Sequence, residues 1–151
     1  MVAVLEGGCE RGGPADGGIK AAREAIEERI GFWLDQLWLT ERRADRVQTL
    51  SRGMRQRLAV ARAFLHDPAV ILLDEPFTAL DDKAIAVLQQ LLARAREERR
   101  TIVLSTHQLR EALELATHVA LIVRGKLAHF GERTPEMLDD PGWLYRNYGE
   151  G

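Results

Sequence analysis

Two stretches of the chain show the apolar spacing of amphipathic helices. Between residues 21 and 39, apolar side chains recur at steps of three and four residues, which is the period of one helix face. They are Ala22, Ile26, Ile30, Trp33, Leu34 and Leu37. A second helical run covers residues 58–65. Its helix is expected to end by Asp67, because Asp67 precedes Pro68 and a residue before proline resists helical geometry. A polar connector rich in Arg, Glu and Asp is predicted at residues 40–49, between these two helices.

Short apolar runs in the rest of the chain predict strands. They are residues 70–73, 101–105, 119–123 and 127–130, with helices predicted at residues 83–98 and 108–116. Repeated strand-helix-strand units form parallel sheets with right-handed crossovers. The unbroken apolar run within residues 101–105 predicts a strand buried on both faces. The predicted fold class is α/β, with a mostly parallel sheet flanked by helices.

Residues 50–57 are the stretch around which the chain is organised. Ser51 and Gly53 come just before the helical run, so backbone N–H groups and the positive end of the helix dipole are expected to point outward together. This is a candidate anion site. Taken alone, the stretch also fits a serine N-cap and a glycine turn ahead of an ordinary amphipathic helix.

Two adjacent carboxylates, Asp74 and Glu75, close the predicted strand at residues 70–73. Like charges side by side near a buried strand end are costly, which argues against a purely structural role. Paired carboxylates of this kind hold Mg²⁺ and polarise water in nucleotide hydrolysis. His107 follows the strand at residues 101–105, at the edge where open parallel sheets bind ligands. The plainer interpretations are solvated carboxylates, a helix-cap partner and a loop histidine.

These stretches resemble four motifs of the ATP-binding subunits of ABC transporters. Residues 50–56 resemble the signature motif, usually Leu-Ser-Gly-Gly-Gln, with Arg52 in place of the first glycine and Met54 in place of the glutamine. Residues 70–75 resemble the Walker B strand and the catalytic glutamate after it. Residues 78–81 resemble the D-loop, and residues 105–107 resemble the switch histidine. The resemblance extends over residues 21–137 and implies a P-loop NTPase (ABC ATPase) fold.

The resemblance implies hydrolysis of the ATP γ-phosphate. Asp74 would hold Mg²⁺, directly or through water. Glu75 would take the proton from the attacking water, provided that its pKa is raised by the neighbouring carboxylate and the apolar strand. His107 would contact the γ-phosphate.

The signature motif would work across a dimer. Ser51, Gly53 and the nearby Arg52 would bind the γ-phosphate of ATP held by an opposite subunit, and Asp81 would bridge the two subunits near the ATP sites. Either Asp81 or Asp82 can also cap the helix predicted at residues 83–98.

The chain departs from the family at its start, where a complete cassette carries its P-loop. Gly13 and Gly18 have the separation of that motif, but Ile19 stands where the lysine belongs and Ala21 follows the displaced Lys20. The sequence therefore resembles the C-terminal half of a cassette that lacks the P-loop strand unit. Either residues 2–5 fill the vacant sheet position, or another polypeptide supplies the missing half.

Composition limits the partners. The net charge of −2 gives no general attraction to nucleic acid, and the arginines between residues 42 and 62 lack interleaved aromatic residues. Cys9 is the sole cysteine, so no internal disulfide is expected. The apolar runs fall short of the roughly 20 residues that a membrane-spanning helix needs. Contact with a membrane is therefore expected only through a partner.

Four segments are predicted. Residues 1–20 form a flexible, glycine-rich N-terminus, and residues 21–140 form the C-terminal half of an ABC ATPase domain. Within it, residues 21–66 form a helical subdomain with the signature and residues 67–140 form an α/β core. Residues 141–151 are an aromatic tail that packs as a cap, with a docking peptide as the alternative.

By resemblance, the chain is an ATP-binding and ATP-hydrolysing subunit of an ABC transporter, truncated or split, located in the cytoplasm at the inner face of the membrane. Its expected partners are a transmembrane permease subunit and a second ATP-binding subunit, in a homodimer or a heterodimer. Arg52, Met54 and residues 75–81 look more like exporter-type cassettes, including those that resemble haem exporters. The alternative is a non-catalytic half-cassette that donates its signature to a complete ATPase subunit. Soluble cassettes of DNA repair or translation are a less favoured third class.

Overall fold

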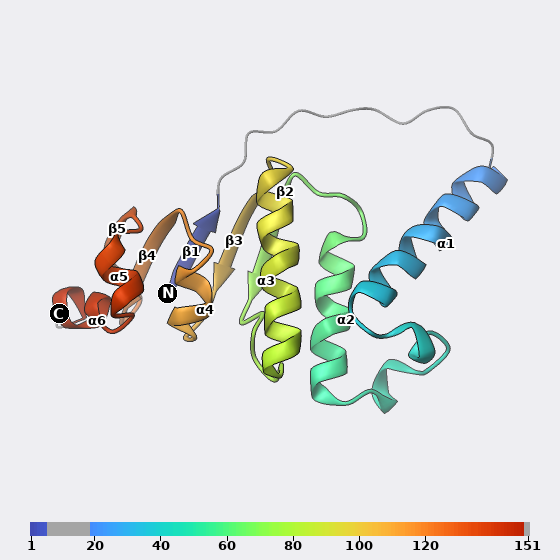
Figure 1. The fold of residues 1–151 in the computed structure, drawn as a ribbon, viewed down its shortest axis with the longest axis horizontal. Coiled ribbons are helices and arrows are strands. Elements are labelled where there is room, and N and C mark those ends of the chain that lie inside the picture. The colour runs from blue at the N-terminus through green and yellow to red at the C-terminus, as the bar shows by residue number, and fades with distance from the viewer. Residues whose placement is uncertain (6–18, 150–151) are drawn as a thin grey trace.

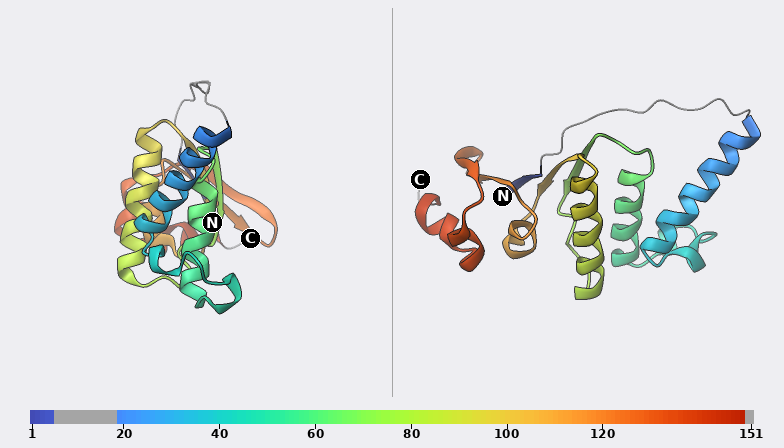
Figure 2. Two further views of the ribbon diagram at one scale, coloured as in Figure 1. Left: turned by 90° about the vertical axis from the view of Figure 1, so that its right-hand side faces the viewer. Right: turned by 45° about the horizontal axis from the view of Figure 1, so that its top comes forward.

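The structure of the chain is a computed structural model that describes residues 1–5 and 19–149. The glycines of the near-miss P-loop, and most of the stretch predicted to be flexible, lie outside these residues. The elements follow one another along the long axis of the molecule, from α1 at one end to α6 at the other (Figures 1 and 2). No helix in the described part is long and apolar enough to cross a membrane.

The first helices form a layer of their own beside the sheet. Helix α1 (Ile19–Gln36) packs against α2 (Arg52–Phe64), and the rings of Trp33 and Phe64 lie 4.9 Å apart between them. Two short 3₁₀ helices, η1 (Thr40–Arg42) and η2 (Val47–Thr49), connect the pair. Helix α1 ends before the predicted residue 39, because the chain reverses at Trp38, whose φ of +54° is left-handed.

The sheet has five strands in the order β2-β3-β1-β4-β5. They are β1 (Val2–Leu5), β2 (Val70–Asp74), β3 (Thr101–Ser105), β4 (His118–Val123) and β5 (Lys126–Glu132). Only β2 and β3 pair in parallel, whereas β1 is antiparallel to both β3 and β4, and β4 and β5 form an antiparallel pair. The α/β class is confirmed, but the sheet is mixed and the expectation of a mostly parallel sheet is wrong.

Strand β1 explains this difference. It lies between β3 and β4 and runs against them, with Val2 opposite Ser105 and Leu5 opposite Ile102. Residues 2–5 therefore fill a place inside the sheet, which was the first of the two explanations for the missing strand. The prediction that all of residues 1–20 are flexible is wrong for these residues, because backbone pairing on both sides holds them.

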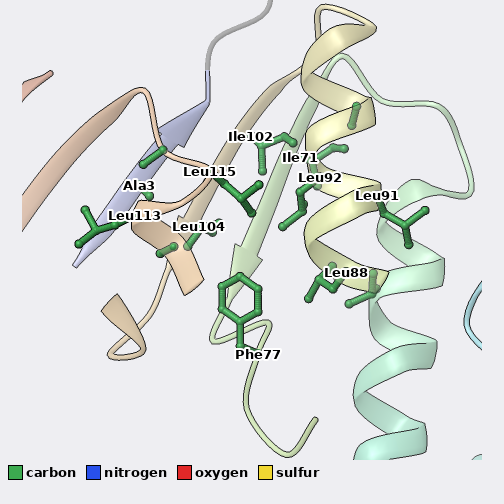
Figure 3. Close-up of a cluster of buried hydrophobic side chains, with 14 of the residues drawn as sticks. Ala3, Ile71, Phe77, Leu88, Leu91, Leu92, Ile102, Leu104, Leu113 and Leu115 are labelled. Atoms are coloured by element: carbon green, nitrogen blue, oxygen red, sulfur yellow. The ribbon is translucent and has the colours of Figure 1, made fainter. Parts of the chain in front are cut away.

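One face of the sheet carries the core. Helices α3 (Asp82–Glu97) and α4 (Leu109–Leu113) cover this face, and Leu88 and Leu92 of α3 pack toward Ile71, Ile102 and Leu104 of the strands (Figure 3). Beyond them, α5 (Pro135–Asp139) and α6 (Trp143–Tyr148) end the chain, with Leu144 fully buried. The ring of Tyr148 stacks on His129 at 4.4 Å, which ties α6 to β5.

The other face of the sheet is open to solvent in the described part of the chain. Its large apolar side chains with high exposure are Val70, Leu72, Ile122, Leu127 and Phe130. Strand β3 alternates accordingly: Ile102 and Leu104 are fully buried, but Val103 is only half-buried. The prediction that this strand is buried on both faces is therefore wrong, because the described helices cover only one of them.

Candidate functional site

The ends of β2 and β3 bring the predicted carboxylates and the histidine together. The parallel register places Asp74 opposite Ser105, and the Ser105 hydroxyl donates a hydrogen bond to the Asp74 carboxylate. The next residue, Glu75, donates its backbone N–H to the Ser105 carbonyl at 2.8 Å. Glu75 has a left-handed φ of +46°, which is uncommon for a residue other than glycine. The chain therefore turns sharply there and leaves the Glu75 side chain beside the segment after β3.

The Glu75 carboxylate is paired with His107. Its Oε2 lies 2.9 Å from Nδ1 of His107, and the hydroxyl of Thr106 donates to the same oxygen at 3.3 Å. Thr78 donates to it from the other side at 3.5 Å. The side chains of Glu75 and His107 are 40% and 70% exposed, so a ligand can reach both.

The pKa of Glu75 is lowered rather than raised. Burial raises this pKa, but the hydrogen bonds from the His107 side chain and backbone, the charge of His107 and the Thr106 hydroxyl together outweigh it. The expectation that Asp74 and the apolar strand would raise the pKa of Glu75 is therefore wrong. The carboxylate turns toward His107 instead of being confined in an apolar site.

This lowered pKa predicts how stability depends on pH. The ordinary pKa is 4.5, so ionised Glu75 stabilises the folded chain above that pH, and the contribution is lost as the pH falls through the lower folded value. We expect the difference in free energy of unfolding between wild type and Glu75→Gln to be largest above about pH 5 and to shrink as the pH falls toward about 3. Urea unfolding at the two ends of this range measures it, and an unchanged difference would contradict the assigned pairing.

The signature stretch begins α2. Ser51 is the N-cap, and its hydroxyl oxygen accepts the backbone N–H of Met54 at 3.2 Å. Arg52 is the first residue of the helix and is exposed. A Cβ on Gly53 would stand 2.8 Å from the carbonyl oxygen of Ala79, so this glycine allows the D-loop-like segment to approach α2. Signature and D-loop therefore touch within the chain.

Replacing Gly53 by alanine is expected to destabilise the chain by about 1–2 kcal/mol, because the clash with backbone outweighs the better helix propensity of alanine. Gly31→Ala is the matched control. Gly31 lies inside α1 and its added Cβ would meet only the end of Arg43 at 3.8 Å, so about 1 kcal/mol of stabilisation is expected there. Urea unfolding of both variants gives the comparison, and a gain in stability at both positions would contradict the close approach of Ala79.

Asp81 caps the next helix. Its Oδ1 accepts the backbone N–H of Ala84 at 2.8 Å, so Asp81 rather than Asp82 is the N-cap of α3. Asp81 is also exposed. Within the described residues, no hydrogen bond or ion pair joins Ser51, Arg52, Gly53 or Asp81 to Glu75 or His107. The structure thus forms two groups: Asp74, Glu75 and His107 at the strand ends, and the signature residues at the start of α2.

One link between the two groups escaped prediction from sequence. The side-chain amide of Gln56 on α2 donates to the backbone carbonyl of Glu75 at 3.1 Å and to that of Pro76 at 3.2 Å. Gln56 lies three residues after Gly53, so both face the same side of the helix. That spacing was the available signal, but it does not reveal which segment packs there.

Known proteins are similar to this chain in sequence and in fold. The family model described as ABC transporter matches residues 9–78. An uncharacterized ABC transporter ATP-binding protein, MJ1023 of Methanocaldococcus jannaschii, is 33% identical over 110 residues, which are 73% of this chain and 42% of that protein. In sequence and in fold, the chain is similar to part of an ABC transporter ATP-binding domain.

Other relatives of this partial cassette have names that state a cargo. The aliphatic sulfonates import ATP-binding protein SsuB of Burkholderia pseudomallei is 45% identical over 72% of this chain and 32% of that protein. The nitrate import ATP-binding protein NrtD of Synechococcus elongatus is 40% identical over 82% of this chain and 47% of that protein. The chain spans less than half of each of these relatives.

Solved structures confirm the fold of the partial cassette. The structure of an ATP-binding subunit of an ABC transporter has a TM-score of 0.68 and 28% identity, covering 89% of this chain and 53% of that chain. The dimeric structure of MJ0796, a bacterial ABC transporter cassette, has a TM-score of 0.67 and 31% identity, covering 83% and 51%. The described residues therefore correspond to about half of a cassette.

Proposed function

We propose that this chain is an ATP-binding and ATP-hydrolysing component of an ABC transporter, working with a transmembrane permease subunit at the inner face of the membrane. The observation that carries the proposal is the pairing of Glu75 with His107 at 2.9 Å, beside Asp74, where two parallel strands end. Residues 21–66 would be the helical subdomain and residues 67–140 the α/β core.

In this proposal the residues at the strand ends perform the hydrolysis. Asp74 would hold Mg²⁺, which neutralises charge on the ATP phosphates when bound. The described residues fit this shared role, because Asp74 is an exposed carboxylate at the end of β2, and Mg²⁺ bound with phosphates needs only one or two carboxylates. Glu75, kept ionised by its lowered pKa, would accept the proton of the attacking water. His107 would leave Glu75 to contact the γ-phosphate.

The signature residues would act on ATP held by a second ATP-binding subunit. Ser51 and Arg52 are exposed and do not touch this chain's own Glu75, which supports a role across an interface. Ser51, Arg52 and Gly53 would bind the γ-phosphate, and Asp81 would bridge the subunits while it caps α3. The second subunit would be a different chain that carries a P-loop; a second copy of this chain would serve only if its glycine-rich N-terminus binds the phosphates.

The second candidate function is a half-cassette that donates its signature to a complete ATPase subunit without catalysis of its own. One observation favours it. Strand β1 occupies the place between β3 and β4 and enters reversed, so that Leu5, where the strand ends, lies opposite Ile102, away from Glu75. Strand β1 therefore ends at the edge of the sheet opposite to the one that carries the carboxylates.

The direction of transport stays a prediction. The exporter-type interpretation, including the resemblance to haem exporters, rests on Arg52, Met54 and residues 75–81. The named relatives reported above are import proteins for sulfonates and nitrate, so their names lend it no support.

Calorimetric titration of the full chain with Mg-ATP, with Lys20→Ala as the control, tests the proposal. We expect no saturable binding by the chain alone, and binding once an ATP-binding subunit with its own P-loop is added. In that mixture Ser51→Ala should weaken binding. Micromolar binding by the chain alone that Lys20→Ala abolishes would instead make the glycine-rich N-terminus a phosphate loop. If the mixture binds no more ATP than the P-loop subunit alone does, the proposal fails.

A further inference from the structure

Gln56 holds the segment that carries Glu75. Its amide nitrogen donates to two successive backbone carbonyls, those of Glu75 and Pro76, at 3.1 and 3.2 Å. The side chain is half-buried, and Pro76 is buried. The two bonds therefore fix the backbone at the point where the chain leaves β2.

This point of the backbone needs to be held. Glu75 has a φ of +46°, a conformation that persists in a residue with a side chain only when its surroundings impose it. A change of φ at Glu75 would swing its carboxylate away from His107 and Thr106. The backbone N–H of Glu75 is fixed on the β3 side by the Ser105 carbonyl, and Gln56 fixes the carbonyl side from α2.

Gln56 also belongs to the helix that begins with the signature. It lies five residues after the Ser51 cap on α2, a rigid element, and Gly53 of the same helix touches the Ala79 carbonyl. A displacement of the start of α2 is therefore transmitted through Gln56 to the carbonyl of Glu75. Few other bonds among the described residues could transmit a displacement of α2 to Glu75, because no ion pair or hydrogen bond joins Ser51 or Gly53 directly to Glu75.

We propose that Gln56 is a positioning residue that sets the orientation of the Glu75 carboxylate and couples it to the signature end of α2. This inference rests on the proposed function for its relevance to ATP hydrolysis. Its structural part is that the pairing of Glu75 with His107 depends on Gln56. This part does not require the chain to take part in ATP hydrolysis.

The test is the ¹³C NMR chemical shift of the Glu75 carboxyl carbon in the full chain at one fixed pH near neutrality, with the signal assigned from Glu75→Gln. Gln56→Met keeps the length of the side chain and removes the donor. His107→Ala gives the change in this shift when the pairing is lost. The matched control is Gln89→Met: Gln89 also donates from a helix, α3, to a backbone carbonyl, that of Glu111 at 3.3 Å, but it lies outside the site.

We expect Gln56→Met to change the Glu75 chemical shift in the same direction as His107→Ala does, with Gln89→Met unchanged. A folded Gln56→Met whose Glu75 shift equals that of wild type would overturn the inference. If circular dichroism shows that Gln56→Met is unfolded, Gln56→Asn, whose shorter amide cannot reach both carbonyls, is judged by the same comparison.

A second measurement separates this inference from the proposed function. ATP turnover is assayed with the P-loop-bearing subunit present, and Gln56→Met should lower kcat more than it changes KM. If the unaltered chain adds no turnover, the proposed function fails while the NMR result still decides the role of Gln56. If turnover is present and the Glu75 chemical shift does not respond to Gln56→Met, only the role of Gln56 fails.

Discussion

Replacing Glu75 by Gln is expected to lower ATP turnover by roughly 10²–10⁴-fold in the proposed assembly of this chain with its partners. The loss is expected at the ATP site to which this chain contributes Glu75. Removal of a positioned general base has an effect of this size. The substitution keeps the shape of the side chain but removes the carboxylate that pairs with His107. Phosphate release by the assembly of this chain, a P-loop-bearing subunit and the permease measures it.

Glu136→Gln is the matched control for this experiment. Glu136 is an exposed glutamate whose pKa is also lowered, through the Thr134 side chain, but it lies at the start of α5, outside the site. Turnover should be unchanged in this variant. If Glu75→Gln also leaves turnover unchanged while Ser51→Ala lowers it, the chain acts only as a donor of its signature, which is the second candidate function.

Replacing Phe77 by alanine is expected to reduce the free energy of unfolding by about 3–5 kcal/mol. Phe77 is 1% exposed and lies two residues after Glu75, so its ring anchors the segment that carries the carboxylate to the core (Figure 3). A loss of this size is a large part of the 5–15 kcal/mol that stabilises a typical domain. Urea unfolding monitored by circular dichroism measures the change.

The control for Phe77 is Phe130→Ala. Phe130 lies on the open face of the sheet and is 62% exposed, so its removal should change stability by no more than about 0.5 kcal/mol. Similar losses at both positions would mean that the open face is covered in solution. A small loss at Phe77 would mean that the segment after β2 is not anchored as the structure has it.

Features with local signals could be predicted from the sequence. The strand at residues 101–105 has the expected bounds, and α3 begins where the aspartates indicated, because a strand pattern and a cap depend on neighbouring residues. The proximity of His107 to Asp74 and Glu75 could also be predicted, because neighbouring parallel strands end at the same edge of a sheet.

Features that depend on distant segments could not be predicted. The reversed insertion of β1 depends on which strands accept it, and four apolar residues carry no information on direction. The lowered pKa of Glu75 depends on His107 and Thr106, which follow β3, and their hydrogen bonds and charge outweigh the effect of burial. The early end of α1 follows from a left-handed Trp38, a conformation that the sequence gives no reason to expect.

The place of β1 in the sheet also determines the order in which the chain can fold. The backbone of Met1 bonds to that of Thr106, 105 residues further along, and β1 pairs only with β3 and β4. During synthesis β1 leaves the ribosome before both of its partners, and it cannot be paired on both sides until β3 and then β4 have emerged. Such non-local pairing is slow because a long loop must close first. Closing of the sheet is therefore expected to be a late step of folding, with the gap between β3 and β4 open until then.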